Sequence, residues 1–513
     1  MDNKKRFLIN MTTQILSFVI NLGINFFLSG YIVNVIGKEV YGFVGLANNF
    51  ISYIQIFTVA FNAMLSRFVT IKFAEKKYEE ASKYLSSVTI CNIGVSVILL
   101  IPSVLLSCFL QYIVEVPDLY IVDIKILWML VFVSFLIQLA TTSFQTCFFV
   151  TNRLDLSAKR SLENYFLRAT LLFVLFGFFE PHIWYVGVVS LICAIYLAGL
   201  NKYYMKRLIP QIKIKKAHFS FEAIRELVGV GIWNSINQLS QLLMTGFDLL
   251  IANIFLGSGE MGMLSIAKMV PTQLISFIGM VSNVFSPKMT MVYASRDKNA
   301  FLKEVFFSIK VCGALCSVPL IGFIAFGKAF FGLWMNSLSN SEIVQIQILS
   351  VLTLLPNIFS VYIFPLYNVN TITCKLKIPV LVSTGVGIAN LGIVYVLLQN
   401  TSFGIYAVAG VSSVLLLVRI LLFVPMYAAN NLKVKIFTFY PPIIRGAMAS
   451  GFMLVIFYSV SKFIQINEWI DLICVGGACG IIGYIINYYI IFEYGERVKL
   501  VNLFKNKLNR LKK

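Results

Sequence analysis

The chain has 513 residues, of which 59% are hydrophobic and only 12% are charged, and its mean hydropathy is +0.85. A soluble domain has about 25% charged residues, so this composition excludes a single water-facing domain and predicts a polytopic membrane protein. The formal net charge of +20 is spread over many loops. This spread favours membrane topology over nucleic-acid binding as its cause, and we expect no nucleic-acid partner.

Apolar runs long enough to cross a bilayer follow one another along the whole chain. A transmembrane helix needs about 20 mostly apolar residues. Fourteen such runs are predicted at 10–35, 43–66, 85–110, 125–150, 163–181, 183–204, 227–256, 262–286, 305–331, 345–369, 378–399, 403–428, 441–464 and 469–492. The runs lack the period-two alternation of barrel strands, so we expect an all-α membrane protein with about 14 transmembrane helices.

Lysine and arginine are distributed so that they indicate the topology. Basic segments such as MDNKKR at the start, NKYYMKRLIPQIKIKK at 201–216 and the tail 496–513 fall on one side of the membrane. Loops on the other side keep little beyond Lys38, Lys328 and Lys462. Because positive residues accumulate on the cytoplasmic side, both termini are predicted inside. The apolar run after the basic start is too long for a cleaved signal peptide, and none is expected.

An internal repeat is indicated by two similar glycine turns. In GKEVYG, Gly37 and Gly42 correspond to Gly257 and Gly262 in GSGEMG, at an offset of 220 residues. The repeat unit contains six predicted helices, an even number, so both copies start on the same side and are parallel. The predicted division is an N-lobe at 1–206, a cytoplasmic linker at 207–226, a C-lobe at 227–430, two further helices within 431–493, and a basic cytoplasmic tail at 494–513.

The linker is basic, and we interpret it as an inner-surface segment with a short interfacial helix. Ser220 is the predicted N-cap of that helix, FEAIREL. The segment either touches anionic lipid or is an ordinary solvated connector.

Ionisable residues inside the predicted spans are the first candidates for function, because burying a charge in lipid is costly. They are Arg168, Asp248, Lys268 and Arg419. At 1.5 Å per residue, Asp248 lies about 13 Å before Gly257 and Lys268 about 9 Å after Gly262. The two charges are therefore expected at similar depth, either as a structural ion pair or as part of a hydrated cavity. Pro271 is expected to bend the helix just after Lys268.

The sign of these charges indicates the kind of substrate. Three bases against one acid favour an anionic group, and arginine suits phosphate especially well. Arg67, Lys288 and Lys310 lie at inner ends of spans and are secondary candidates, with topology determination as the alternative role.

Amide side chains form a stripe on the seventh predicted span. Its members share one helical face and are Asn234, Asn237, Gln238 and Gln241. Amides on a cavity wall suit sugar hydroxyls, whereas interhelical hydrogen bonds are the competing interpretation.

Signatures of an enzyme or a metal site are weak. The string GFIAFGKA at 322–329 imitates a phosphate-binding loop, but Ala329 stands where serine or threonine is needed and an apolar span precedes it. The two histidines, His182 and His218, are predicted on opposite sides of the membrane, and the cysteines suit apolar packing. We expect no enzymatic activity, no metal and no cofactor, apart from a coupling ion, H⁺ or Na⁺.

The stretches IGKEVYGFVGLA and FDLLIANIFLG…MGMLSIAKMV resemble the Wzx-type oligosaccharide-lipid flippases of the multidrug/oligosaccharidyl-lipid/polysaccharide (MOP) exporter superfamily. Asp248 followed by Leu256-Gly257 matches the family pattern, whereas Leu249 and Met263 depart from the arginine and tyrosine common there. The resemblance implies two lobes around a central cavity and alternating access. It implies as substrate a polyprenyl-pyrophosphate-linked oligosaccharide, flipped to the outer leaflet for surface polysaccharide, including capsule or lipopolysaccharide.

On this hypothesis Arg168, Lys268 and Arg419 hold the pyrophosphate, and Asp248 pairs with Lys268 or takes part in ion coupling. Membrane lipid and other polysaccharide-assembly proteins are the expected partners. The alternatives are a lipid II flippase and a multidrug or cation antiporter of the same superfamily. By analogy with lipid II flippases, the last two spans would form a groove for the lipid tail.

Overall fold

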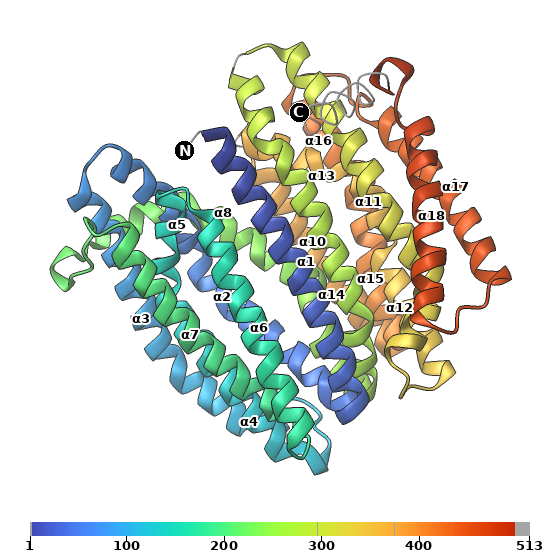
Figure 1. The fold of residues 1–513 in the computed structure, drawn as a ribbon, viewed down its shortest axis with the longest axis horizontal. Coiled ribbons are helices and arrows are strands. Elements are labelled where there is room, and N and C mark those ends of the chain that lie inside the picture. The colour runs from blue at the N-terminus through green and yellow to red at the C-terminus, as the bar shows by residue number, and fades with distance from the viewer. Residues whose placement is uncertain (1–2, 295, 374, 498–513) are drawn as a thin grey trace, which may run out of the picture. The chain divides into compact units, whose positions relative to one another are not determined.

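The computed structural model describes residues 3–294, 296–373 and 375–497, and the regular elements in these ranges are all helical (Figure 1). The α-helices are α1 (Asn3–Ile36), α2 (Lys38–Ala74), α3 (Tyr78–Cys108), α4 (Ile121–Thr141), α5 (Thr146–Val150), α6 (Leu154–Phe178), α7 (Trp184–Leu208), α8 (Phe221–Gln241), α9 (Asp248–Leu256), α10 (Ser258–Ala294), α11 (Lys298–Trp334), α12 (Asn340–Leu354), α13 (Asn357–Ile372), α14 (Lys377–Asn400), α15 (Ile405–Val418), α16 (Val424–Asn431), α17 (Tyr440–Phe463) and α18 (Trp469–Ile490).

The predicted all-α membrane fold is confirmed. Within the described ranges, 13 helical segments are long and apolar enough to cross a membrane. The predicted span 163–181 is missing from that set, although α6 covers most of it. The physical reason is composition, since α6 also carries charges such as Arg160, Glu163 and Arg168 that lower its hydropathy.

Four of the predicted spans are interrupted helices. Short 3₁₀ geometry at Thr142–Gln145 separates α4 from α5, and Pro356 precedes α13. Two π-helical segments, Leu242–Gly246 and Arg419–Phe423, separate α8 from α9 and α15 from α16. The spans were predicted from the length of apolar runs, which does not indicate where a helix is interrupted. In contrast, α10 continues through Pro271, and the expected bend there stays a prediction.

The two glycine turns have the same backbone geometry. Gly37 has φ 97° and Gly257 has φ 94°, a region that side chains other than glycine rarely adopt. The helices that follow, α2 and α10, each contain 37 residues and start 220 residues apart. The residues two positions beyond their ends, Lys76 and Arg296, both have φ 59°. This agreement supports the predicted repeat over this stretch, while the lobe boundaries stay a prediction.

The chain divides into two compact units between Ser265 and Ile266, inside α10. In the first unit, α2 packs along α8 and α3, and α4 packs along α7. Its core includes Leu65, Leu85, Phe148 and Leu227, all nearly or completely buried.

The second unit is built around α11, which contacts α12, α13, α17 and α18. The Tyr362 ring lies between Gly313 and Gly446, where an added Cβ would come within 2.1 and 2.2 Å of ring atoms. The Tyr362 hydroxyl donates to the Gly446 carbonyl at 2.8 Å and lies 2.9 Å from the Ser450 hydroxyl oxygen. These contacts join α17 to α13 in the core of this unit.

The linker between α7 and α8 follows the prediction only in part. Ser220 is the N-cap, and its hydroxyl accepts a hydrogen bond from the Ala223 amide at 3.4 Å. The expected separate interfacial helix is wrong, because residues from Phe221 onward belong to α8. The stretch after Ser220 contains neither glycine nor proline until Gly229, so nothing ends the helix early.

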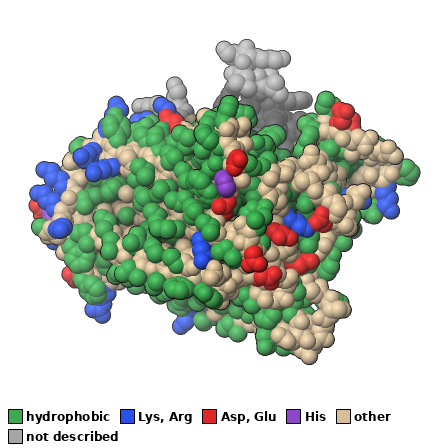
Figure 2. Space-filling view, turned by 90° about the horizontal axis from the view of Figure 1, so that it is seen from below, with side chains coloured by type: hydrophobic (Ala, Val, Ile, Leu, Met, Phe, Trp, Pro, Cys, Tyr) green, Lys and Arg blue, Asp and Glu red, His purple; other side chains and the backbone are tan. Residues whose placement is uncertain are grey.

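Large hydrophobic side chains are exposed over both units, as expected for surfaces in lipid. Examples are Phe57, Phe173 and Ile470, which are 74%, 68% and 68% exposed. Figure 2 shows hydrophobic side chains over much of the surface that it displays. Such continuous apolar exposure is rare in soluble monomers and fits a multi-pass membrane protein.

Candidate functional site

Asp248 is the most deeply buried of the predicted site residues. It opens α9, one residue beyond the π-helical segment Leu242–Gly246 and its cap Phe247, and is only 1% exposed. A π-helical turn leaves backbone groups without their regular partners and is frequent at functional sites. The role of Asp248, as part of a structural ion pair or of a hydrated cavity, stays a prediction.

Side chains of α2 donate hydrogen bonds to the backbone of the π-helical segment Leu242–Gly246. Asn49 donates to the Gly246 carbonyl at 2.9 Å, and the Tyr53 hydroxyl donates to the same oxygen at 2.8 Å. The Tyr53 ring stacks on Phe247, with centroids 4.7 Å apart. Asn49 is a polar residue inside the predicted span 43–66 and could have been noticed there. Tyr53 gave no signal in the sequence, because an aromatic residue in an apolar span looks like packing.

Arg419 has a similar backbone setting in the second unit. It is the first residue of the π-helical segment Arg419–Phe423 and is half-buried. Its guanidinium donates to the Tyr367 hydroxyl at 3.3 Å and lies 6.0 Å from the centroid of that ring. Arginine presents several N–H donors in a planar group, a geometry that suits phosphate oxygens.

Arg168 lies on α6 within a network of amides. It donates to the Asn25 side-chain oxygen at 3.3 Å, and the Asn25 amide in turn donates to Asn21. The Asn21 and Asn25 side chains come from α1, which packs along α6. Arg168 is half-buried, and the Asn21 and Asn25 side chains of this network are uncharged.

Lys268 is half-buried on α10, one residue after the Ala267 carbonyl that accepts a hydrogen bond from Ser350 at 2.7 Å. It belongs to the second unit and Asp248 to the first. Their pairing therefore stays a prediction.

The secondary bases have different surroundings. Arg67 is exposed on α2. Lys288 forms an ion pair with Glu304 at 2.6 Å, and Lys310 pairs with Glu496 at 2.8 Å. Lys288 is thus paired with a carboxylate of the next helix and Lys310 with one 186 residues further along the chain, and the sequence analysis predicted neither pair.

The predicted amide stripe on α8 lies beside the face that packs on α2. Ser235 donates to the Ile56 carbonyl at 2.7 Å on the packed face. Of the stripe, Asn234 and Gln238 are half-buried, and Asn237 and Gln241 are exposed.

Asn62 of α2 is an amide that forms interhelical hydrogen bonds, the alternative role considered for the amides of the spans. Its side chain exchanges two hydrogen bonds with Asn92 of α3, at 3.1 and 3.0 Å. That amide serves helix packing.

The two copies of the glycine turn meet within the first unit. A Cβ built on Gly42 would lie 2.9 Å from the Gly262 Cα, and one on Gly262 would lie 2.5 Å from the Lys38 carbonyl oxygen. Only glycine permits backbones this close. The starts of α2 and α10 therefore form a tight crossing, and the turns that looked like repeated connectors also contact each other.

The described part of the chain offers little for metal or nucleotide chemistry. It contains no group of three or more His, Cys, Asp or Glu side chains placed to hold a metal ion. The loop-like string at 322–329 lies inside the continuous helix α11 and cannot wrap a phosphate.

Comparison with known proteins places this arrangement in a family. Residues 7–292 match the model of a family described as polysaccharide biosynthesis protein. The chain belongs to this family. It is also 25% identical, over 98% of both chains, to the uncharacterised membrane protein EpsK of Bacillus subtilis (strain 168).

Solved structures share the fold. The chain matches the lipid II flippase MurJ, in an inward closed conformation, with a TM-score of 0.71 and 17% identity, over 94% of this chain and 98% of that one. It matches an inward-facing multidrug resistance MATE family transporter of the MOP superfamily with a TM-score of 0.64 and 14% identity, over 83% and 99%. The predicted polysaccharide biosynthesis family is confirmed by the family model, and this chain shares the fold of these flippase and transporter structures.

Proposed function

We propose that the chain moves a polyprenyl-pyrophosphate-linked oligosaccharide from the inner to the outer leaflet by alternating access. The observation that carries the proposal is the excess of base inside the spans. Arg168, Lys268 and Arg419 are half-buried there, while Asp248 is the buried acid among the predicted site residues. Membership of the polysaccharide biosynthesis family supports the same substrate class.

In this mechanism the three bases bind the pyrophosphate, the most highly charged part of the substrate. Charge-assisted hydrogen bonds to phosphate contribute about 1.5–3 kcal/mol each. The amides Asn234, Asn237, Gln238 and Gln241 would contact sugar hydroxyls. Asp248 would pair with Lys268 or bind a coupling ion, either H⁺ or Na⁺.

Alternating access requires that the crossing of Gly42 and Gly262 opens on the side to which the substrate is released. Gly42 and Gly262 themselves contribute no side chains to this contact. The topology proposed for this cycle has both termini inside, in a bacterial inner membrane.

The test is neutralisation of single bases in a strain that depends on this chain for surface polysaccharide. We expect K268Q and R419Q each to abolish surface polysaccharide while the amount of protein in the membrane stays unchanged. K328Q, which removes an exposed base of α11, is the matched control and should export normally. Full export by the double variant K268Q/R419Q would overturn the assignment.

Two related functions, lipid II flippase and multidrug or cation antiporter, can be distinguished from this proposal by experiment. The similarity to the MurJ fold favours a lipid II flippase as the second candidate. Depletion of the chain would then accumulate lipid II instead of an oligosaccharide lipid. A multidrug or cation antiporter would require acids, and increased sensitivity of a deletion strain to cationic dyes would identify it.

A further inference from the structure

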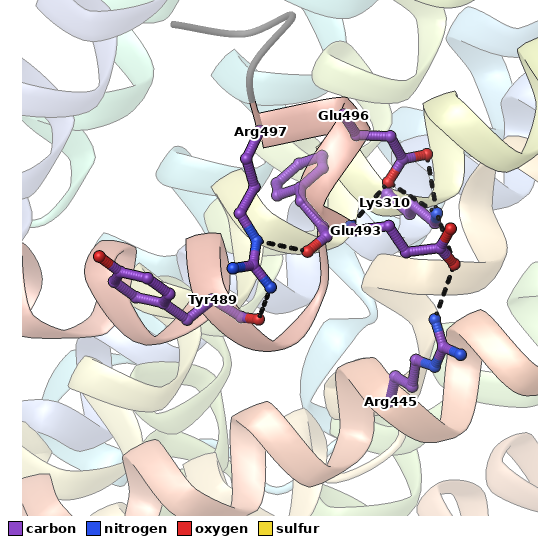
Figure 3. Close-up of polar contacts among 7 residues, drawn as sticks. Lys310, Arg445, Tyr489, Glu493, Glu496 and Arg497 are labelled. Carbon is purple, nitrogen blue, oxygen red and sulfur yellow. Dashed lines mark hydrogen bonds and ion pairs between the residues drawn. The ribbon is translucent and has the colours of Figure 1, made fainter.

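A cavity of about 590 Å³ lies in the second unit and is lined by none of Arg168, Asp248, Lys268 and Arg419. It is formed by α11, by the start of α17 and by the turn after α18 (Figure 3). The predicted topology puts all three of these ends on the inner side of the membrane. The helices α17 and α18 lie outside the predicted duplication, so this cavity has no counterpart in the first half of the chain.

Charged side chains dominate one wall of the cavity. Lys303, Lys310 and Arg445 face Glu493 and Glu496, which leaves an excess of one positive charge. Lys310 is only 8% exposed, and its ammonium group contacts both oxygens of Glu496 at 2.8 Å. A buried ammonium is stable only when it is paired in this way. Glu496 therefore belongs to the permanent structure of the wall.

The other contacts of the wall are more open to exchange. Arg445 donates to Glu493 at 2.9 Å, but their side chains are 52% and 64% exposed. An exposed pair of this kind is worth about 1 kcal/mol or less. Within the described ranges, Lys303 has no ion-pair or hydrogen-bond partner. Two bases are thus available at the mouth of the cavity to an anion that competes with Glu493.

The turn that carries both acids is fixed to α18. Arg497 donates to the carbonyls of Phe492 and Tyr489 at 2.8 and 2.7 Å, at the end of α18 (Figure 3). These bonds satisfy carbonyl groups that a helix end leaves free. The cavity is therefore a preformed feature of the inner end of the helix.

The remaining lining is apolar. Phe306 and Phe307 of α11 and Pro441 and Pro442 of α17 contribute rings to the same cavity. Apolar rings make no favourable contact with a free inorganic ion. An amphiphile, in contrast, has a hydrocarbon portion next to its phosphate that can pack against them. The combination of one excess positive charge and apolar rings fits a molecule with one negative charge and a hydrocarbon portion.

We propose that this cavity binds the phosphodiester group of an anionic phospholipid from the inner leaflet. Lys303 and Arg445 contact the phosphate, Glu493 is displaced from Arg445, and the phenylalanine and proline rings contact the glycerol and upper acyl carbons. Lys310 and Glu496 remain paired and form the floor of the site. The inference does not depend on the flippase assignment, since the site contains none of the four main candidates Arg168, Asp248, Lys268 and Arg419.

The experiment measures lipid binding by the purified, delipidated full chain in detergent. Dioleoylphosphatidylglycerol is titrated and bound lipid is counted by native mass spectrometry, with dioleoylphosphatidylcholine as the zwitterionic reference. We expect phosphatidylglycerol to bind at least about tenfold more tightly, and K303Q/R445Q to lose about tenfold or more of that affinity. K303Q alone should lose part of it, and because Lys303 has no described partner, this variant should fold normally.

Matched variants and a soluble probe separate the explanations. K298Q/K435Q removes the same charge from neighbouring exposed bases and should bind lipid like the wild type. E493Q weakens the competitor and should bind phosphatidylglycerol more tightly. Equal binding of phosphatidylcholine, or wild-type binding by K303Q/R445Q, would overturn the proposal. Displacement of the lipid by millimolar inorganic phosphate would overturn its lipid source and assign the cavity to a soluble phosphate.

Discussion

The helices α2 and α10 have nearly the same backbone and different chemistry. Each has 37 residues, and each follows a glycine with φ near 95°. At the 220-residue offset Asn48 of α2 corresponds to Lys268 of α10. Asn48 donates to the Val44 carbonyl of its own helix at 2.9 Å. Two similar scaffolds thus carry an amide bound within its own helix in one copy and a charge in the other.

The backbone geometry of the glycine turns is the same in the two copies, whereas the charges inside the spans differ between them. Glycines fix the turn and the crossing, and they are present in both copies. Asp248 and Lys268 are charged residues of the second copy. In the first copy the corresponding positions are occupied by Leu28 and Asn48, which carry no charge. Variants at paired positions can therefore test which features are structural and which are functional.

The largest effect is expected from exchanging the charge for its counterpart. K268N should lower polysaccharide export at least about tenfold, because a charge-assisted contact to phosphate is worth more than 1.4 kcal/mol. N48A should leave export nearly unchanged, since it removes only a bond within α2. Export is measured as surface polysaccharide per amount of membrane protein. Similar losses in both variants would mean that the two copies contribute equally and would break the distinction.

The second effect concerns the crossing of the two copies. G262A should destabilise the protein by about 1–3 kcal/mol, because its Cβ would lie 2.5 Å from the Lys38 carbonyl oxygen. G42A should have an effect of the same order, since its Cβ would meet the Gly262 Cα at 2.9 Å. Thermal unfolding in detergent measures both. G322A is the control, because nothing lies within 4 Å of that position, and unchanged melting of G262A would contradict the tight contact.

A smaller effect is expected at the turns themselves. G37A and G257A should each cost about 1–2 kcal/mol, since alanine is strained at these positive φ values. G257A also brings its Cβ to 3.3 Å from the Glu115 carboxylate, whereas nothing lies within 4 Å at Gly37. The same unfolding measurement should therefore rank G257A as equally or more destabilised. A neutral G37A would show that the first turn adopts another geometry in solution.

The smallest effect concerns the ion pairs beyond the duplicated part. Arg445, and then Lys310, hold the pKa of Glu493 below its ordinary value. Its contribution to stability is therefore present above the unfolded pKa of about 4.3 and is lost as pH falls through the lower folded value. Because Glu493 is exposed, the contribution is below about 1 kcal/mol.

The measurement for this pair is the melting temperature between pH 7 and pH 3. Wild type should lose slightly more stability on acidification than E493Q, which lacks the titrating group. E180Q, which changes an exposed glutamate in the loop after α6, should acidify like the wild type. Identical curves for wild type and E493Q would remove the ion pair from the account of how α18 is anchored.

The amino-acid sequence by itself determined the membrane class, the approximate spans and the duplicated turn. It could do so because lipid forces backbone groups into helices, so that apolar length predicts a span. It also singled out Asp248 and Arg419, since charges stand out against an apolar background. The glycine spacing predicted the repeat because only glycine adopts the backbone geometry of the two turns.

The partners of the polar side chains could be found only from the tertiary structure. The π-helical breaks at Leu242–Gly246 and Arg419–Phe423 each offer a carbonyl to a tyrosine of another helix, Gly246 to Tyr53 and Leu421 to Tyr440. The pairing of Lys310 with Glu496 joins positions 186 residues apart. Such contacts are set by helix packing, and hydropathy, a local property of the chain, contains no information about which distant side chain will arrive as the partner.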